Sequence, residues 1–283
     1  MTVTIVRFSR NSGLVAGVVI LTCVLSTAIL ATWLAPYDPY RQDLAHRLID
    51  PAWYPGGSWA HPLGTDGYGR DYLSRLLYGA RISLTIGVVT MIVSGIIGTT
   101  LGIIGGYFGG IADLIVNFFV TVRLSMPIIL VALAVVALIG GSLTVVILVL
   151  GFLLWDRFAV VTRSVVQQIR EQEYVTAAHA IGASTLRIVG RSVLPNIADQ
   201  LVVIGTLEMA HAIILEAALS FLGLGVQPPL PSWGLMIAEG KTFMFFKPWL
   251  IAFPGVALFL LVLAINLVGD GIRDVTSPRR VAH

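Results

Sequence analysis

The chain has 283 residues, of which 57% are hydrophobic and 12% charged, and its mean hydropathy is +0.89. This composition excludes a water-soluble globule and predicts an all-α polytopic membrane protein in a lipid bilayer. The net charge of +3 is not gathered into a basic run interleaved with aromatic residues, so we expect no nucleic-acid partner.

Residues 14–34 are the first uncharged run, and 21 residues at about 1.5 Å per residue can cross a hydrocarbon core of roughly 30 Å. Arg7 and Arg10 precede this run, as basic residues do in a signal peptide. The run is longer than the usual signal-peptide core, and no A-x-A site follows it. We therefore expect a retained first transmembrane helix behind a cytoplasmic tail of residues 1–13.

Residues 35–81 are predicted to form an extracytoplasmic loop. Its end carries apolar side chains at helical spacing with charged residues between them, which indicates an amphipathic helix lying at the membrane interface. These apolar residues are Tyr72, Leu73, Leu76, Leu77 and Ala80.

The second predicted span, residues 82–106, contains a stripe of glycines four residues apart: Gly98, Gly102 and Gly106. Such a stripe allows another helix to approach closely. The alternative is that it reflects only the high glycine content of membrane helices.

Four more spans follow. Residues 124–155 are free of charge but too long for one helix, and the Gly140-Gly141-Ser142 interruption predicts a hairpin of spans three and four. Residues 200–222 and 249–268 are spans five and six, which makes six transmembrane helices. Residues 82–268 then form a five-helix core with a cytoplasmic loop at 156–199, an extracytoplasmic loop at 223–247 and a cytoplasmic tail at 269–283.

The basic residues favour a cytoplasmic position for both termini, with 11 on the inner side and 7 on the outer side. The inner residues are Arg7, Arg10, Arg123, Arg157, Arg163, Arg170, Arg187, Arg191, Arg273, Arg279 and Arg280. The outer residues are Arg41, Arg47, Arg70, Arg75, Arg81, Lys241 and Lys247. On this orientation Gly182 is inside, whereas Gly64 and Trp233 are outside.

The cytoplasmic loop is predicted to contain a helical elbow. Residues 171–181 have acidic side chains in a first turn, and Gly182 stands where a helix C-cap glycine is expected. Ser184 would then cap a second helix that stops near Pro195. The small side chains near Gly182 would let another protein approach closely, although alanine is also simply a good helix former.

Several strings in the chain resemble a known family. Thr176-Ala177-Ala178, Gly182 and Ser192-Val193-Leu194-Pro195 are similar to the EAA loop of bacterial ABC importer permeases. Further strings are similar to the dipeptide, oligopeptide and nickel permeases, in order from about residue 37 to residue 279. They are residues 61–66 (HPLGTD), 69–71 (GRD), 73–76 (LSRL), 105–110 (GGYFGG), 173–175 (EYV), 220–229 (SFLGLGVQPP), 231–234 (PSWG) and 266–270 (NLVGD).

The resemblance implies the fold of type I ABC importer permeases and a coupling helix that seats in a groove of a cytoplasmic ATPase. The implied coupling residues are Glu173, Tyr174, Thr176, Ala177, Ala178, Gly182, Leu194 and Pro195. Two positions depart from the family pattern, because Thr176 replaces the EAA glutamate and Ser192 replaces an isoleucine. The first departure removes a glutamate that could form a salt bridge to the ATPase.

The same resemblance implies the partners: a second homologous permease, two ATP-binding subunits that hold ATP and magnesium, and an extracytoplasmic substrate-binding protein. The chain is then expected in the bacterial cytoplasmic membrane, and its transported substrate is expected to be a short peptide. Nickel and other small solutes stay open as alternative substrates.

The chain itself shows no catalytic motif, and we expect no enzyme activity or cofactor in it. The string Gly240-Lys241-Thr242 lacks the earlier glycine of a P-loop, so ATP hydrolysis belongs to a partner. An intramembrane protease would commonly show a Gly-x-Ser-Gly string, which is absent, and a secondary transporter would show an internal repeat.

Span five carries Glu208, His211 and Glu216 on one broad helix face. Ionisable groups at membrane depth usually face a bundle interior or water, so these residues are candidates for lining the translocation path. The alternative is that they satisfy one another or make helix-end contacts. The histidines lack ligand spacing, and we assign no metal site.

Overall fold

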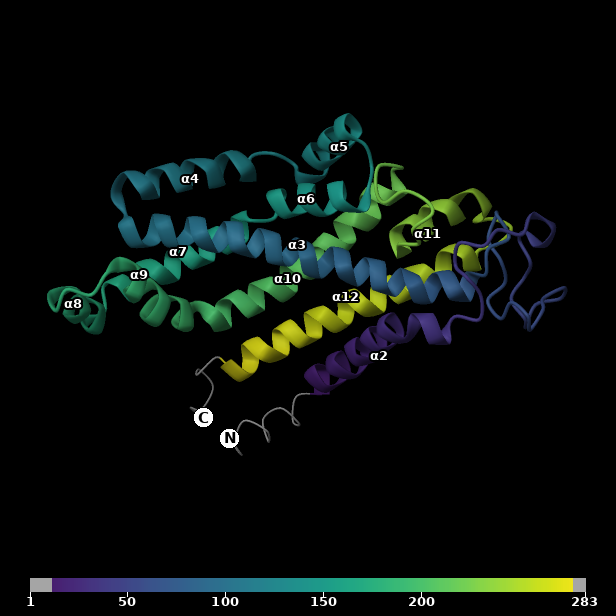
Figure 1. The fold of residues 1–283 in the computed structure, drawn as a ribbon, viewed down its shortest axis with the longest axis horizontal. Helices are drawn as coiled ribbons and strands as arrows, with labels where there is room; N and C mark the ends of the chain where they lie inside the picture. The colour runs from purple at the N-terminus through teal and green to yellow at the C-terminus, as the bar shows by residue number, and fades with distance from the viewer. Residues whose placement is uncertain (1–11, 277–283) are drawn as a thin grey trace.

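The structure is a computed structural model that describes residues 12–276, so Arg7, Arg10, Arg279 and Arg280 lie outside the described residues. Figure 1 shows an elongated bundle of helices. The elements are α2 (Ser12–Leu34), η1 (Leu44–His46), α3 (Tyr72–Phe108), α4 (Gly110–Leu124), α5 (Ile128–Ile139), α6 (Leu143–Leu153), α7 (Asp156–Arg170), α8 (Glu173–Ala180), α9 (Thr185–Ile188), the π-helical turn η2 (Val189–Val193), α10 (Leu194–Phe221), α11 (Trp233–Gly240), η3 (Lys241–Phe243) and α12 (Trp249–Thr276).

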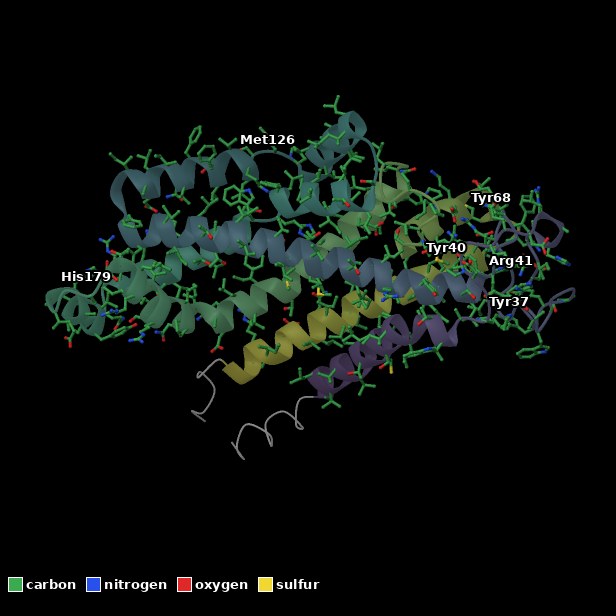
Figure 2. All side chains as sticks on the ribbon, viewed as in Figure 1. Tyr37, Tyr40, Arg41, Tyr68, Met126 and His179 are labelled. Atoms are coloured by element: carbon green, nitrogen blue, oxygen red, sulfur yellow. The ribbon has the colours of Figure 1, made fainter. Side chains whose placement is uncertain are left out.

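The two ends of the bundle differ. The α8–α9 elbow lies at one end and the loop of residues 35–71 lies at the other (Figure 1). Figure 2 marks the same separation, because His179 is at the elbow end and Tyr37, Tyr40, Arg41 and Tyr68 are at the loop end. The start of α2 and the end of α12 both point toward the elbow end.

The prediction of six crossings agrees with the structure when one bent helix pair is counted as a single crossing. Five helical stretches are long and apolar enough to span a bilayer, and α4 with α5 would make the sixth. Buried side chains join α2, α3, α10, α11 and α12 in one core, whereas α5 and α6 pack against α10 in a second core.

The predicted third span falls on a bent helix pair. Helix α4 begins at Gly110, before the predicted start at residue 124, and α4 and α5 meet at an angle of 84°. The break falls just before Pro127, where proline disfavours a helical conformation of the preceding residue. The Gly140–Ser142 interruption was predicted correctly, because Gly140 has a positive φ of 102° and Ser142 caps α6 by accepting from the Val145 amide.

The predicted cytoplasmic loop begins with a helix that continues span four. Helices α6 and α7 together make a helical stretch of residues 143–170 that is long and apolar enough to be a candidate span, and α7 starts at Asp156, where the loop was predicted to begin. The charges that suggested a loop are paired within the bundle: Asp156 with Arg123, and Arg163 with Asp113.

No separate interfacial helix is formed by residues 72–80. These residues are the first turns of α3, capped by the Asp71 carboxylate, which accepts a hydrogen bond from the Ser74 amide at 2.8 Å. Tyr72 and Arg75 are buried, because elements far away in the sequence cover them. The amphipathic pattern is therefore that of a helix whose polar side faces protein.

The glycine stripe packs against α7, as the close-approach interpretation predicts. A Cβ atom at Gly98 would lie 2.2 Å from the Trp155 carbonyl oxygen. At Gly102 and Gly106 the nearest atoms of α7 would be 2.6 and 2.7 Å away. The stripe thus determines which helix α3 contacts along its inner half.

Contacts between helices show how deep each residue lies relative to the apolar run of α2. A side chain at Gly271 would collide with Leu14, and one at Gly269 would collide with Thr206. Gly271 is therefore level with Leu14, at the start of that run, and Thr206 is level with Gly269, about 3 Å further along the bundle at about 1.5 Å per residue. Glu208 follows Thr206 by two residues and so lies roughly 6 Å inside the start of the run, and Glu216 lies roughly 18 Å inside it. We call the boundary of the hydrocarbon core on the elbow side the inner boundary and the one on the side of the loop of residues 35–71 the outer boundary. On this estimate Glu208 is near the inner boundary, and Glu216 is near the middle of the core.

The same argument places both ends of α3. Gly87 faces Ile213 of the antiparallel α10, so Arg75 lies near the outer boundary of the core. The last residues of α3 extend roughly 15 Å beyond the inner boundary. The elbow therefore stands on a helical stalk that projects from the membrane.

The segment 223–247, which was predicted to be an extracytoplasmic loop, contains α11, which packs among α3, α10 and α12. Trp233 is buried, and its indole donates a hydrogen bond to the Leu76 carbonyl at 2.9 Å. A probe for outside exposure belongs at Phe246, which is exposed, rather than at Trp233.

Candidate functional site: the elbow and the charged groups of the bundle

The elbow is closed by a full Schellman motif. Gly182 has a φ of +79°, its amide donates to the His179 carbonyl, and the Ala183 amide donates to the Ala178 carbonyl, each at 3.0 Å. Glycine is required here because other L-residues seldom adopt this left-handed conformation. The sequence prediction of a C-cap glycine is confirmed.

One side of the elbow packs onto the stalk. Val175, Ile188 and Val193 form a buried cluster with Tyr107 of α3 and with Val166 of α7. The Tyr107 hydroxyl and the His179 Nε2 atom share a hydrogen bond of 2.8 Å. The elbow is therefore attached to the stalk by apolar packing and by a polar contact.

The other side of the elbow faces away from the chain. Of the predicted coupling residues, those with exposed positions are Glu173, Tyr174, Thr176, Ala177, Gly182, Leu194 and Pro195. Ala178 is only partly exposed and packs on the buried cluster, so a bulky residue at position 178 would disturb the elbow itself. A side chain added at Gly182 would meet no atom within 4 Å.

Two apolar residues beside Gly182 were missed by the sequence reasoning. Ile181 is 85% exposed and Leu186 is 83% exposed. Large apolar side chains that are this exposed beyond the membrane commonly mark a protein-protein contact. Their positions on both sides of the cap glycine were the available signal.

Pro195 does not end the elbow's second helix, contrary to the prediction. Helix α9 continues through η2 into α10, where Pro195 occupies the first turn. The π-helical turn η2 comes directly before it, and there the Leu194 amide donates to the Val189 carbonyl five residues back, a local change of register that accommodates the missing amide of proline. The elbow thus joins α10 without an intervening loop.

Glu208 and His211 lie together, as their spacing predicts, and Arg157 of α7 joins them. The Arg157 Nη1 atom lies 3.1 Å from Glu208 Oε1, and His211 Nδ1 lies 3.6 Å from Glu208 Oε2. Glu208 is fully buried within this chain, whereas the Arg157 side chain is 58% exposed. The accessible part of this group is cationic.

Glu216 makes a different contact and does not join the pair. Its Oε1 atom accepts hydrogen bonds from Ser220 at 2.7 Å and from Ser232 at 2.8 Å. Ser232 also caps α11 by accepting from the Leu235 amide. The carboxylate thus sits at the N-terminus of α11, where a negative charge is favourable. This is the helix-end contact that was the alternative to path lining.

Helices α3 and α10 enclose a mainly apolar groove of about 760 Å³ toward the elbow end. Its walls include Met91, Gly95, Phe158, Gly205 and Met209. Neither Glu208 nor Glu216 lines this groove, because both carboxylates turn toward other elements.

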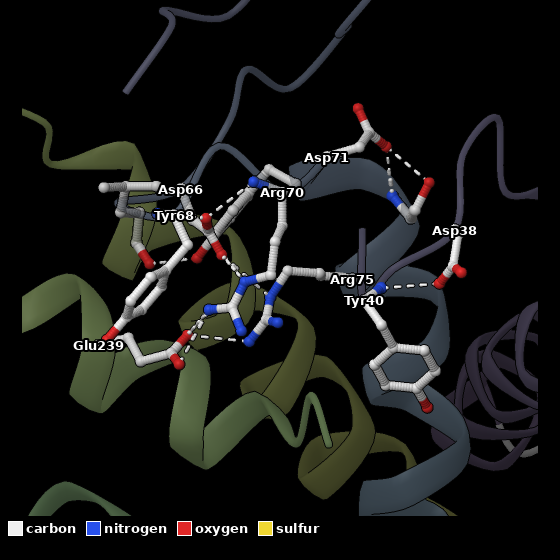
Figure 3. Close-up of polar contacts among 11 residues, drawn as sticks. Asp38, Tyr40, Asp66, Tyr68, Arg70, Asp71, Arg75 and Glu239 are labelled. Atoms are coloured by element: carbon white, nitrogen blue, oxygen red, sulfur yellow. Dashed lines mark hydrogen bonds and ion pairs between the residues drawn. The ribbon is translucent and has the colours of Figure 1, made fainter. Parts of the chain in front are cut away.

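Figure 3 shows the contacts of a buried ion cluster between the loop of residues 35–71, the start of α3 and the end of α11. Arg70 donates from Nε to Asp66 at 2.6 Å and from Nη2 to Glu239 at 2.9 Å, and Arg75 donates to Glu239 at 2.9 Å. Burial lowers the pKa of Arg70, but the two carboxylates outweigh it, so the net direction of the pKa is upward. The cluster holds two positive and two negative charges and is balanced.

This outer ion cluster occupies strings that the family resemblance singled out without assigning a role. Asp66, Arg70 and Arg75 fall in the strings at 61–66, 69–71 and 73–76. Glu239, at the end of α11, is outside those strings and could not be connected to them by sequence spacing. The cluster borders a cavity of about 340 Å³ that Tyr68 and Phe243 also line.

Within residues 12–276, no three His, Cys, Asp or Glu side chains lie close enough together to hold a metal ion. Gly240 ends α11 and Lys241 begins η3, so no strand-loop-helix surrounds the glycine-lysine-threonine string in this part of the chain.

Two family models match the chain. The model described as the inner membrane component of binding-protein-dependent transport systems matches residues 98–281. The model described as the N-terminal transmembrane domain of oligopeptide transport permease C matches residues 3–51.

Whole-length relatives are also found. The chain is 44% identical over 272 residues to the dipeptide transport system permease protein DppC of Escherichia coli K12, covering 96% of this chain and 91% of that protein. It is 38% identical to the Haemophilus influenzae DppC, with 96% and 92% covered, and 38% identical to the glutathione transport permease GsiD of Pectobacterium atrosepticum, with 96% and 90% covered.

The fold is similar to that of a chain in the inward-facing MetNI methionine ABC transporter. The TM-score is 0.56 at 21% identity, with 72% of this chain and 97% of that chain covered. At this identity the likeness concerns the fold alone, and it agrees with the predicted fold of ABC importer permeases.

Proposed function

The chain belongs to the family of inner membrane components of binding-protein-dependent transport systems, and from this membership we propose that it is the permease subunit of an ABC importer of short peptides. The multi-pass helical bundle and the whole-length similarity to dipeptide permeases support this function. Members of this family are transport components, and we expect ATP hydrolysis in partner subunits.

The observation that carries the proposal is the elbow at the end of a projecting stalk. Ile181 and Leu186 present two apolar side chains on either side of Gly182, which leaves open space around it. Both side chains would enter a groove of a cytoplasmic ATPase. The wall of that groove would then lie close to the backbone at Gly182. Thr176 offers no carboxylate for a salt bridge, so apolar contact would supply most of the docking energy.

In the proposed assembly this chain pairs with a second homologous permease, two ATP-binding subunits and an extracytoplasmic binding protein. ATP and magnesium are then held by the ATP-binding subunits. Both termini and the elbow would be cytoplasmic, in a bacterial cytoplasmic membrane. The apolar groove between α3 and α10 is the concave surface that the second permease or a passing solute would meet.

The candidate path residues are not equivalent in this proposal. Arg157 and His211 are the accessible members of the group near the inner boundary, and Glu208 holds Arg157 in place. Glu216 positions α11 instead of lining a passage. We therefore propose a role in the inner part of the path for the Glu208 group only.

Docking is tested by co-purification of the ATP-binding subunits with tagged permease. Ile181→Asp and Leu186→Asp should each reduce co-purification at least tenfold, since an interface anchor residue is worth about 2 kcal/mol or more. Leu44→Asp, at an exposed apolar position of the outer loop, is the matched control and should have no effect. Full co-purification with both elbow variants would contradict the docking assignment.

The substrate class is tested separately by uptake of labelled di- and tripeptides in cells that lack this chain. Loss of peptide uptake, with restoration by the intact chain, is the expected result. Normal peptide uptake in the deleted cells, combined with loss of nickel uptake, would instead support the nickel alternative.

A further inference from the structure

Helix α3 connects the elbow to the outer end of the chain without a break. It has 37 residues, which at about 1.5 Å per residue make a rod of roughly 55 Å. Its inner end carries Tyr107, and its outer end carries Tyr72 and Arg75. Helix α10 also runs from the elbow to the start of α11, at Ser232, whereas α3 carries Arg75 of the outer ion cluster.

The inner attachment of this rod is polar and directional. Besides the 2.8 Å hydrogen bond between the Tyr107 hydroxyl and His179, Arg170 Nη1 donates to the Tyr107 carbonyl at 2.9 Å. His179 belongs to the last turn of α8, directly before the Schellman turn. A displacement of the elbow along its surface would strain this hydrogen bond before it separated the apolar cluster, because hydrogen bonds depend on angle as well as distance.

The outer attachment reaches the two elements that follow α10. The Tyr72 hydroxyl donates to the Leu250 carbonyl at the start of α12, and Arg75 donates to Glu239 of α11. Helix α11 is in turn anchored at its other end by Ser232 and Glu216. A shift of α3 along its axis would therefore act on α11.

We infer that Tyr107 and His179 are positioning residues that transmit movement of the elbow to α3, and that α3 carries this movement to α11 through the outer ion cluster. This inference rests on the proposed coupling of the elbow to an ATPase. It adds the specific contact at which the coupling enters the membrane bundle and the element on which it acts.

Two measurements on the assembled complex in liposomes test the inner contact: ATP hydrolysis and peptide uptake. Tyr107→Phe removes only the hydroxyl, and uptake per ATP hydrolysed should fall about fivefold, the factor corresponding to one hydrogen bond. His179→Ala should have the same effect, His179→Gln should largely restore coupling, and the double variant should be no worse than either single one. Tyr54→Phe, at an exposed outer tyrosine, is the matched control.

A purely structural role would give a different result. Less complex would assemble, and the complex that did assemble would transport the normal amount of peptide per ATP. That outcome, or normal coupling in Tyr107→Phe, would overturn the inference. Loss of ATPase co-purification with normal controls would instead concern docking, which the Ile181 and Leu186 variants test separately.

Movement at the outer end is measured with the variant Thr242→Cys in a Cys23→Ser background, which leaves a single cysteine. Thr242 is exposed and lies just after α11. In the complex with wild-type Tyr107, the rate of labelling by a membrane-impermeant maleimide should differ between the nucleotide-free and vanadate-trapped states. In Tyr107→Phe this difference should disappear. An unchanged difference in Tyr107→Phe, or no difference with wild-type Tyr107, would contradict transmission through α3.

Discussion

Glu239→Gln tests how strongly the outer ion cluster holds the loop of residues 35–71. The substitution keeps the shape of the side chain but removes the carboxylate that accepts hydrogen bonds from both Arg70 and Arg75. Arg75 is 0% exposed, so its charge cannot turn to water. Two guanidinium groups would then share the single carboxylate of Asp66.

Breaking a buried ion pair costs about 3–5 kcal/mol, and the lower figure applies here because the Glu239 side chain is 20% exposed. About 3 kcal/mol corresponds to a change of more than a hundredfold in the population of the open loop. Hydrogen–deuterium exchange of the segment 61–71, measured by mass spectrometry on the whole complex, reports that population. Exchange in Glu239→Gln should accelerate by about this factor.

The matched control is Asp43→Asn in the same loop. Asp43 pairs with His46, but both side chains are about half exposed, so the pair contributes little. Adding Arg70→Gln to Glu239→Gln restores one balanced pair, Arg75 with Asp66, and should recover part of the protection. Exchange in Glu239→Gln equal to that of the control would refute the claim that this cluster fastens the loop.

Three further predictions concern the bundle and the elbow. Gly98→Ala should lower the free energy of unfolding of the purified protein by about 1–3 kcal/mol, because the added Cβ would meet the Trp155 carbonyl. Gly95→Ala is the control and should be nearly neutral, since the nearest neighbours of its Cβ are ring atoms at 3.5 Å. Equal melting temperatures of the two variants would contradict the packing argument. Glu208→Gln should reduce peptide uptake more than Glu216→Gln. A glutamine at position 216 can still accept hydrogen bonds from Ser220 and Ser232, whereas a glutamine at position 208 cannot form an ion pair with Arg157. The reverse order of uptake would show that Glu216 carries the transport role. Gly182→Ala should destabilise the elbow by about 1 kcal/mol through its positive φ, seen as faster amide exchange of residues 173–188 with the rest of the chain unchanged.

The sequence by itself determined the class of fold and the local turns. Long uncharged runs leave a bilayer-spanning helix as the only conformation that satisfies the backbone. The Gly140–Ser142 break and the cap at Gly182 follow from residue chemistry that acts over a few positions. The elbow was recognisable for the same reason.

Tertiary structure decided which partner each charged residue has. Asp156 pairs with Arg123 and Arg163 pairs with Asp113, and in both pairs the partner lies on α4. Arg75 read as the polar face of an interfacial helix because its partner Glu239 is 164 residues further along the chain. Glu216 accepts a hydrogen bond from Ser220 on its own helix, but also one from Ser232 at the start of α11, which spacing along α10 could not reveal. In each case the cost of burying a charge depends on a partner that spacing along one helix cannot reveal, and only the packed bundle supplies it.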